Sequence, residues 1–130
     1  MGIHDLKSES IDLTTRLTVR EIGVILQEIC EDWKTVPEQV QSNSGALAVF
    51  DDMPDIAIVI HGKAGVLSPQ YYIVHVYVYD LDDKRGVEIV ALGSSALSKF
   101  VAGIKDAVKM SESIKRRDQI AEIIMSRSGQ

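Results

Sequence analysis

Residues 71–80 read YYIVHVYVYD, the longest run of strand-forming residues in the chain, and the fold prediction starts from them. β-Branched and aromatic side chains favour strands, in which successive side chains point to opposite faces. One face of this strand carries Val74, Val76 and Val78. The other carries Ile73, His75, Tyr77 and Tyr79. Because both faces are largely apolar, the run predicts a central strand that is buried on two sides.

Four further segments show the composition or the alternation of strands. They are residues 11–17, 46–50, 55–61 and 87–92. Turn-forming residues 51–54 and the charged stretch 80–86 separate neighbouring segments. Connections this short cannot make parallel crossovers, so the last four strands are predicted to form an antiparallel meander.

A helix is predicted to begin at Thr18, because Thr18 and Glu21 stand at the positions of a capping box. Apolar residues then recur every three or four positions and give the helix one apolar stripe to about Lys34. This stripe consists of Val19, Ile22, Leu26, Ile29, Cys30 and Trp33. The lone cysteine lies on the stripe, which favours a buried thiol over a reactive one. Pro37 prevents the helix from continuing.

A second helical pattern follows Gly93, with Ser94 or Ser95 as its expected N-cap. Its stripe consists of Leu97, Phe100, Val101, Ile104 and Val108. The pattern weakens at residues 111–113 and resumes as far as Met125, so a C-terminal helical extension is predicted at about 112–126. The sequence leaves open whether residues 95–126 form one helix or two.

These elements predict a single α+β domain over residues 11–130, after a flexible N-terminal segment of residues 1–10. The expected architecture is a two-layer sandwich in the order β-α-β-β-β-β-α. Its four- to five-stranded antiparallel sheet carries two main helices on one face. Val74, Val76 and Val78, together with Ile56, Ile58 and Ile60, make the better packing surface for those helices.

The composition is that of an ordinary globular protein, with 45% apolar residues, 25% charged residues and a net charge of −5. The charge is uneven, since residues 94–130 hold 7 basic and 4 acidic side chains. The acidic remainder argues against general nucleic-acid binding, which depends on phosphate contacts. The basic run Lys115–Arg117 is interpreted as a solvated helix face or as a match to the helix dipole. Without a signal peptide or an apolar run long enough to span a membrane, the chain is predicted to be soluble and cytoplasmic.

His75, Tyr77, Tyr79 and His61 are the candidate ligand-binding or interface residues. His61 and His75 end and centre two strands that are expected to be neighbours on the face away from the helices. Two histidines can bind a metal or act as a base, but nothing supplies a third ligand, so no metal site is predicted. A structural histidine, hydrogen-bonded to a tyrosine or to the backbone, is the stronger alternative for each. The tyrosines suit a ligand pocket, an interface or plain sheet stabilisation.

No phosphate loop, nucleophile elbow, paired cysteine motif or zinc-binding helix occurs in the sequence. No catalytic residue and no cofactor are therefore predicted, and an enzyme is the less favoured reading.

Two functional hypotheses remain. The first is a non-enzymatic interaction domain that forms a homodimer, or binds a protein partner, through the open sheet face or the C-terminal helix. It follows from the second apolar face, which is comparable in area to the largest apolar patch that soluble monomers tolerate. The alternative is a small-molecule-binding or enzymatic domain. Its pocket would lie between the sheet and the last helix and be lined by His75, Tyr77 and Tyr79.

Overall fold

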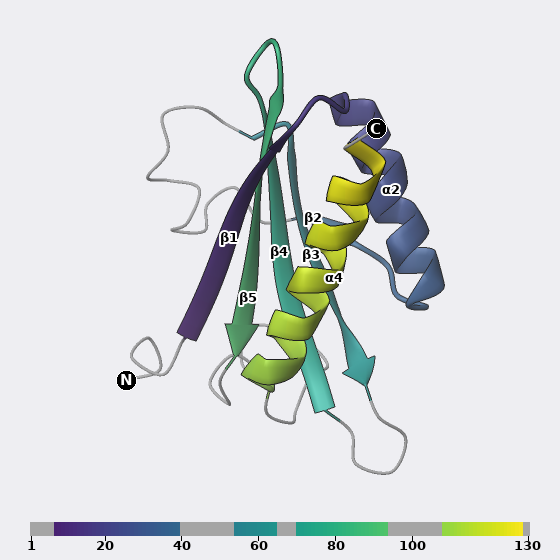
Figure 1. The fold of residues 1–130 in the computed structure, drawn as a ribbon. Coiled ribbons are helices and arrows are strands. Elements are labelled where there is room, and N and C mark those ends of the chain that lie inside the picture. The colour runs from purple at the N-terminus through teal and green to yellow at the C-terminus, as the bar shows by residue number, and fades with distance from the viewer. Residues whose placement is uncertain (1–6, 40–53, 65–69, 94–107, 129–130) are drawn as a thin grey trace.

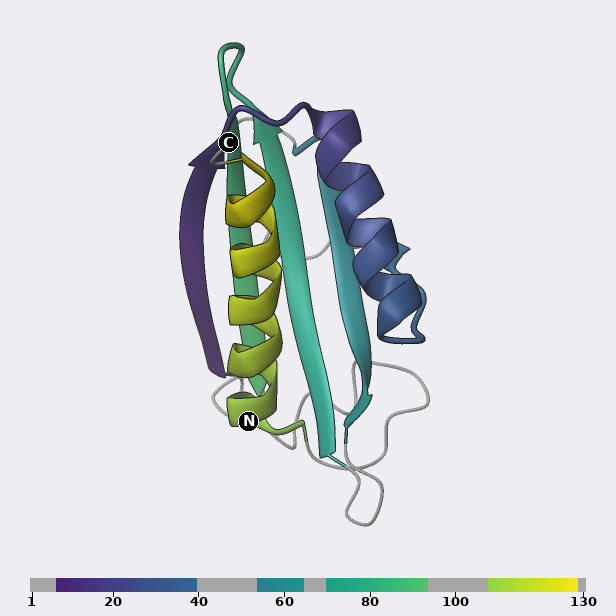
Figure 2. The ribbon, with the colours of Figure 1, turned by 45° about the vertical axis from the view of Figure 1, so that its right-hand side comes forward.

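The structure, a computed structural model, describes residues 7–39, 54–64, 70–93 and 108–128. Its elements are β1 (Lys7–Thr15), α2 (Val19–Asp32), β2 (Glu38–Gln39), β3 (Ile56–Ala64), β4 (Gln70–Asp80), β5 (Arg85–Gly93) and α4 (Met110–Ser128). The five strands form one antiparallel sheet in the order β1-β5-β4-β3-β2. Both helices lie on the same face of this sheet (Figures 1 and 2). The predicted α+β architecture is confirmed.

The hydrophobic core lies between the sheet and the two helices, on what is called here the first face. The strand register aligns Val76 of β4 with Ile58 of β3 and Ile89 of β5, so their side chains point the same way. The buried core contains Ile22, Leu26, Ile60, Tyr72, Val74, Val76, Val78, Ile89, Ile120 and Ile124. The helices therefore cover the valine and isoleucine face that the sequence favours.

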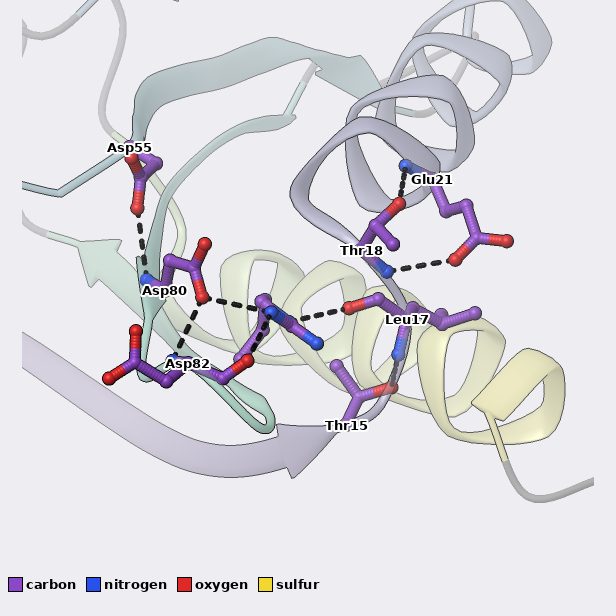
Figure 3. A network of polar contacts seen from close by, with 8 residues as sticks. Thr15, Leu17, Thr18, Glu21, Asp55, Asp80 and Asp82 are labelled. Atoms are coloured by element: carbon purple, nitrogen blue, oxygen red, sulfur yellow. Dashed lines mark hydrogen bonds and ion pairs between the residues drawn. The ribbon is translucent and has the colours of Figure 1, made fainter.

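Local hydrogen bonds fix both ends of α2. The Thr18 hydroxyl accepts from the Glu21 amide at 3.1 Å, and the Glu21 carboxylate accepts from the Thr18 amide at 2.8 Å (Figure 3). This is the predicted capping box. At the other end, Thr35 N donates to Cys30 O and Lys34 N to Glu31 O. That pair of bonds is a Schellman motif, with Lys34 in the left-handed conformation at φ 59°.

Arg85 ties the β4–β5 turn to the corner between β1 and α2. Its Nε donates to Leu17 O at 2.9 Å, and its Nη1 donates to Asp80 Oδ1 at 2.8 Å. The same Asp80 oxygen accepts from the Asp82 amide, and the Asp80 amide donates to Asp55 (Figure 3). The amide of Asp82 and the side chain of Arg85 lower the pKa of Asp80. The turn is therefore held by charge-assisted hydrogen bonds.

The residues just before α4 lie beside the first residues of β4, where Val108 and Tyr71 form an isolated parallel bridge. Lys109 N donates to Tyr71 O at 2.8 Å, and the Ser113 hydroxyl accepts from the Ile73 amide at 3.0 Å. The chain passes so close to β5 that a Cβ on Gly93 would lie 2.6 Å from Met110 Cβ. Only glycine fits there, because that separation is well below van der Waals contact.

Several boundaries differ from those predicted. Lys7–Ser10 were expected in a flexible terminus, but they form the first part of β1, since backbone pairing with β5 requires no apolar side chain. The short strand β2 was not predicted. The expected strand at 46–50, and the expected helix from Ser95 to residue 107, lie outside the described residues. The predicted helical extension at 112–126 lies within α4, whose Ile120 and Ile124 are part of the core.

Candidate functional site

The candidate residues His61, His75, Tyr77 and Tyr79 belong to the sheet face opposite the helices, which is called here the second face. The register pairs His75 with Val59 and Val90, and it pairs Tyr77 with Ala57 and Glu88. Directly opposed residues of antiparallel strands point to the same side, so these rows define the face. β1 contributes Asp12, which lies opposite Glu88.

His75 and Tyr77 form a hydrogen-bonded pair near the middle of the second face. His75 Nδ1 lies 2.9 Å from the Tyr77 hydroxyl, and the two rings meet edge to face. Burial lowers the pKa of His75 to about 4. Burial, together with the charge of Glu88, raises the pKa of Tyr77 to about 12. Both groups are therefore neutral near pH 7, and neither has the pKa near 7 that suits a general acid or base.

An acidic hollow lies at the end of the second face nearest the β4–β5 turn. It has a volume of about 190 Å³ and is lined by Asp12, Leu13, Thr14, Tyr79, Gly86, Val87 and Glu88. Burial and the neighbouring Asp12 raise the pKa of Glu88. Burial and the two carboxylates raise the pKa of Tyr79. The hollow therefore places two carboxyl groups beside a phenol in a lining that is mostly apolar, and carboxyl groups attract cations rather than anions when they are ionised.

His61 has its own polar partners, separate from those of His75. Its Nε2 lies 3.3 Å from Glu38 Oε2 of β2, and its backbone oxygen accepts from the Thr35 hydroxyl at 2.6 Å. His61 pairs with Ile73, so it is only a diagonal neighbour of His75. Within the described segments, no three His, Cys, Asp or Glu side chains are grouped so that they could hold a metal ion.

Within the described residues, α4 does not form the pocket predicted between the sheet and the last helix, and residues 94–107 of that predicted helix lie outside the described residues. α4 packs on the first face, whereas His75, Tyr77 and Tyr79 belong to the second. The centre of the second face is also buried within a single chain, since Ile73 is 1% and Tyr77 is 3% exposed. Val108 packs against Ile73 there. Of the three predicted pocket residues, Tyr79 lines the hollow.

Arg116 is a half-buried cation that the sequence interpretation missed. Its guanidinium lies 4.7 Å from the centre of the Trp33 ring and 4.5 Å from that of Tyr72. Its side chain is 20% exposed, so it is not on a solvated helix face. Helical spacing could have shown this, because Ser113, Arg116 and Ile120 share one side of α4. The contact joins α2, β4 and α4 and stabilises the helical layer.

The outer edge of β1 is the longest strand edge in the structure without a neighbouring strand among the described residues. All nine residues of β1 pair with β5 without a bulge, from Lys7 opposite Gly93 to Thr15 opposite Arg85. The opposite edge strand, β2, has two residues. In Figure 2, β1 (purple) borders the sheet, and neither helix lies beyond it. Arg117 of α4 reaches this strand, since its Nη1 donates to Glu9 O at 3.3 Å.

Comparisons with protein families, with curated proteins and with solved structures found no match to this chain. Neither of the two described helices is long and apolar enough to cross a membrane.

Proposed function

We propose that the protein is a small non-enzymatic interaction domain that binds another polypeptide by strand addition along β1. The observation that carries the proposal is the outer edge of β1, which is nine residues long and has neither a bulge nor a proline. Such an edge presents unpaired N–H and C=O groups and is a template for another strand. Natural proteins usually shorten, bend or cover edges that are not used.

The sequence pointed to two other contact surfaces, the second sheet face and the C-terminal helix. The structure reduces the apolar area that either offers a partner. Ile73 and Tyr77 are buried at the centre of the second face, and Ile120 and Ile124 of α4 are buried in the core. We therefore keep the predicted self-association or protein partner and move the contact to β1.

A binding role also agrees with the electrostatics of the second face. A catalytic base works best with a pKa near the working pH, whereas the pKa of His75 is lowered to about 4. The hydrogen bond to Tyr77 gives this histidine a structural role.

Photocrosslinking tests strand addition directly. A photoreactive amino acid is placed at Ser10, an exposed position in the middle of β1, and the protein is irradiated in its cells of origin. The matched control carries the same group at Gln119, an exposed position on α4. We expect a discrete protein adduct from position 10 that is absent at position 119. Equal or no adduct formation at the two positions contradicts the proposal.

The acidic hollow supports a second candidate function, binding of a small organic cation. Asp12, Glu88 and Tyr79 would supply the negative and aromatic groups that such a ligand needs. Titration with n-butylammonium chloride, against sodium chloride at equal ionic strength, should shift the amide resonances of Glu88 and Tyr79 and spare those of Glu112. The shift should disappear in Glu88→Gln. No difference between the two salts excludes this candidate.

A further inference from the structure

Resting on the proposed function, we infer that the strand that adds to β1 is β1 of a second copy of this chain. The two strands run antiparallel about a two-fold axis that passes through Ile11. The two five-stranded sheets then become one continuous sheet. The axis is normal to the sheet, so the helices of both copies lie on the same side.

This register brings no like charges face to face, and unlike a register centred on Ser10 it does not place Ile11 opposite Glu9. With the axis at Ile11, each Ser10 lies opposite Asp12 of the other copy, and each Glu9 lies opposite Leu13. Lys7 lies opposite Thr15, and Ser8 opposite Thr14. An axis at Asp12 would instead place two Asp12 carboxylates directly opposite each other, and an axis at Glu9 would do the same with Glu9. Opposed like charges destabilise a strand pair.

The Ile11 register also continues the apolar layer across the junction. Ile11 and Leu13 are partly buried hydrophobic residues that pack against the core beneath the helices. Pairing at Ile11 places the two Ile11 side chains together on that same side. Cross-strand β-branched pairs of this kind stabilise antiparallel sheets.

One hydrogen bond of the single chain competes with this pairing. The Glu9 carbonyl that Arg117 contacts at 3.3 Å would have to exchange that contact for an amide of the second copy. The guanidinium keeps its bonds to Asp118 after the exchange, since it donates to Asp118 Oδ1 at 2.9 Å through Nε. Arg117 therefore releases the Glu9 carbonyl without losing its charged partner, Asp118.

The expected dimer is weak to moderate. Nine residues of strand are about 30 Å long, and pairing one edge buries less area than the roughly 1,600 Å² of a standard interface. A dissociation constant on the order of micromolar is therefore expected for this dimer. Electrostatic changes at one pair of positions should then be visible in the dissociation constant.

Sedimentation equilibrium of the full chain tests the register through Ser10 and Ser8, both exposed residues of β1. Ser10→Asp sets two carboxylates against Asp12 at two symmetric places and should raise the dissociation constant roughly 2- to 30-fold. Ser10→Lys should lower it by a similar factor. Ser8→Asp and Ser8→Lys, opposite Thr14, are matched controls with little expected effect. Thermal unfolding of each variant at low concentration checks that the single chain remains folded.

A monomer at every concentration, or equal effects at positions 8 and 10, overturns the inference. The crosslinking experiment separates this failure from that of the proposed function. An adduct at twice the mass of the chain supports self-pairing. An adduct of any other mass from position 10 refutes self-pairing and leaves strand addition standing.

Discussion

The two faces of the sheet are both apolar in sequence, yet they are buried in different ways. On the first face, α2 and α4 cover a layer of mostly aliphatic side chains that also includes Tyr72. On the second, a half-buried histidine, two phenols and a carboxyl group are interspersed with aliphatic residues. The first face therefore holds most of the packing energy, and the second holds the groups whose charge depends on folding. The strand β1 lies at the edge of both faces, with no strand on its outer side among the described residues, and it is where we propose that a partner binds.

The largest expected difference between the faces is in the free energy of unfolding, and neighbouring residues of β3 measure it. Ile60 points into the core and is fully buried, whereas Val59 points to the second face and is partly buried. Ile60→Ala should lower the free energy of unfolding by about 2–5 kcal/mol. Val59→Ala should lower it by less than about 1.5 kcal/mol. Denaturant unfolding measures both changes. Equal losses would contradict the claim that the first face holds more of the packing energy than the second.

Acid should destabilise the protein because folding disfavours the protonated form of His75 on the second face. The pKa of His75 is about 4 in the folded state against an ordinary value of 6.5. Between these values the unfolded chain binds more protons, so stability is lost as pH falls from about 6.5 to about 4 and is constant above and below. The loss should be on the order of 3 kcal/mol.

His75→Gln is the matched variant for this titration. Glu88 has a raised pKa and acts in the opposite direction, so the difference between the variant and the parent isolates His75. Unfolding by urea at a series of pH values should show a smaller loss in the variant. An unchanged pH profile would mean that His75 does not carry this acid sensitivity.

Ser113 is expected to help hold α4 against the sheet through one buried hydrogen bond. Its hydroxyl is the acceptor for the buried Ile73 amide, so Ser113→Ala leaves that amide without its partner. The free energy of unfolding should fall by about 1–3 kcal/mol. Ser111, exposed in the same turn, provides the control, since Ser111→Ala should change it by less than about 0.5 kcal/mol. Similar values for the two variants would contradict an anchoring role for Ser113.

The smallest expected effect is a gain at the end of α2. Lys34 occupies a left-handed position at φ 59°, which glycine adopts without strain. Lys34→Gly should therefore raise the free energy of unfolding by up to about 1 kcal/mol. Thermal unfolding at low protein concentration measures it, and a lowered midpoint would show that the Lys34 side chain contributes more than its backbone strain.

Local chemistry made part of the fold predictable. The capping box fixed the N-cap of α2 at Thr18, and the alternation in residues 71–80 assigned β4 and divided its side chains between two faces. The burial of Cys30 also followed from its place on the helical stripe, and burial raises its pKa to about 11. In each case the signal lies within a few residues.

Features that depend on distant residues were not predictable in the same way. The contact of Arg116 with two aromatic rings joins three elements, and charge alone suggested solvent exposure. Asp12 joins Tyr79 and Glu88 through pairing of β1 with β5, strands far apart in the sequence. The four candidate residues were correctly assigned to one face, but their separate partners, Tyr77 for His75 and Glu38 for His61, required the strand register.

Amide hydrogen exchange of β1 in dilute and concentrated samples tests the central claim most directly, because it reports on the edge itself. Strand pairing at β1 predicts that alternate amides of Lys7–Thr15, those facing away from β5, exchange more slowly as concentration rises. The amides of α4 should keep the same rates. Rates in β1 that do not depend on concentration, or protection that develops on another surface instead, would contradict it.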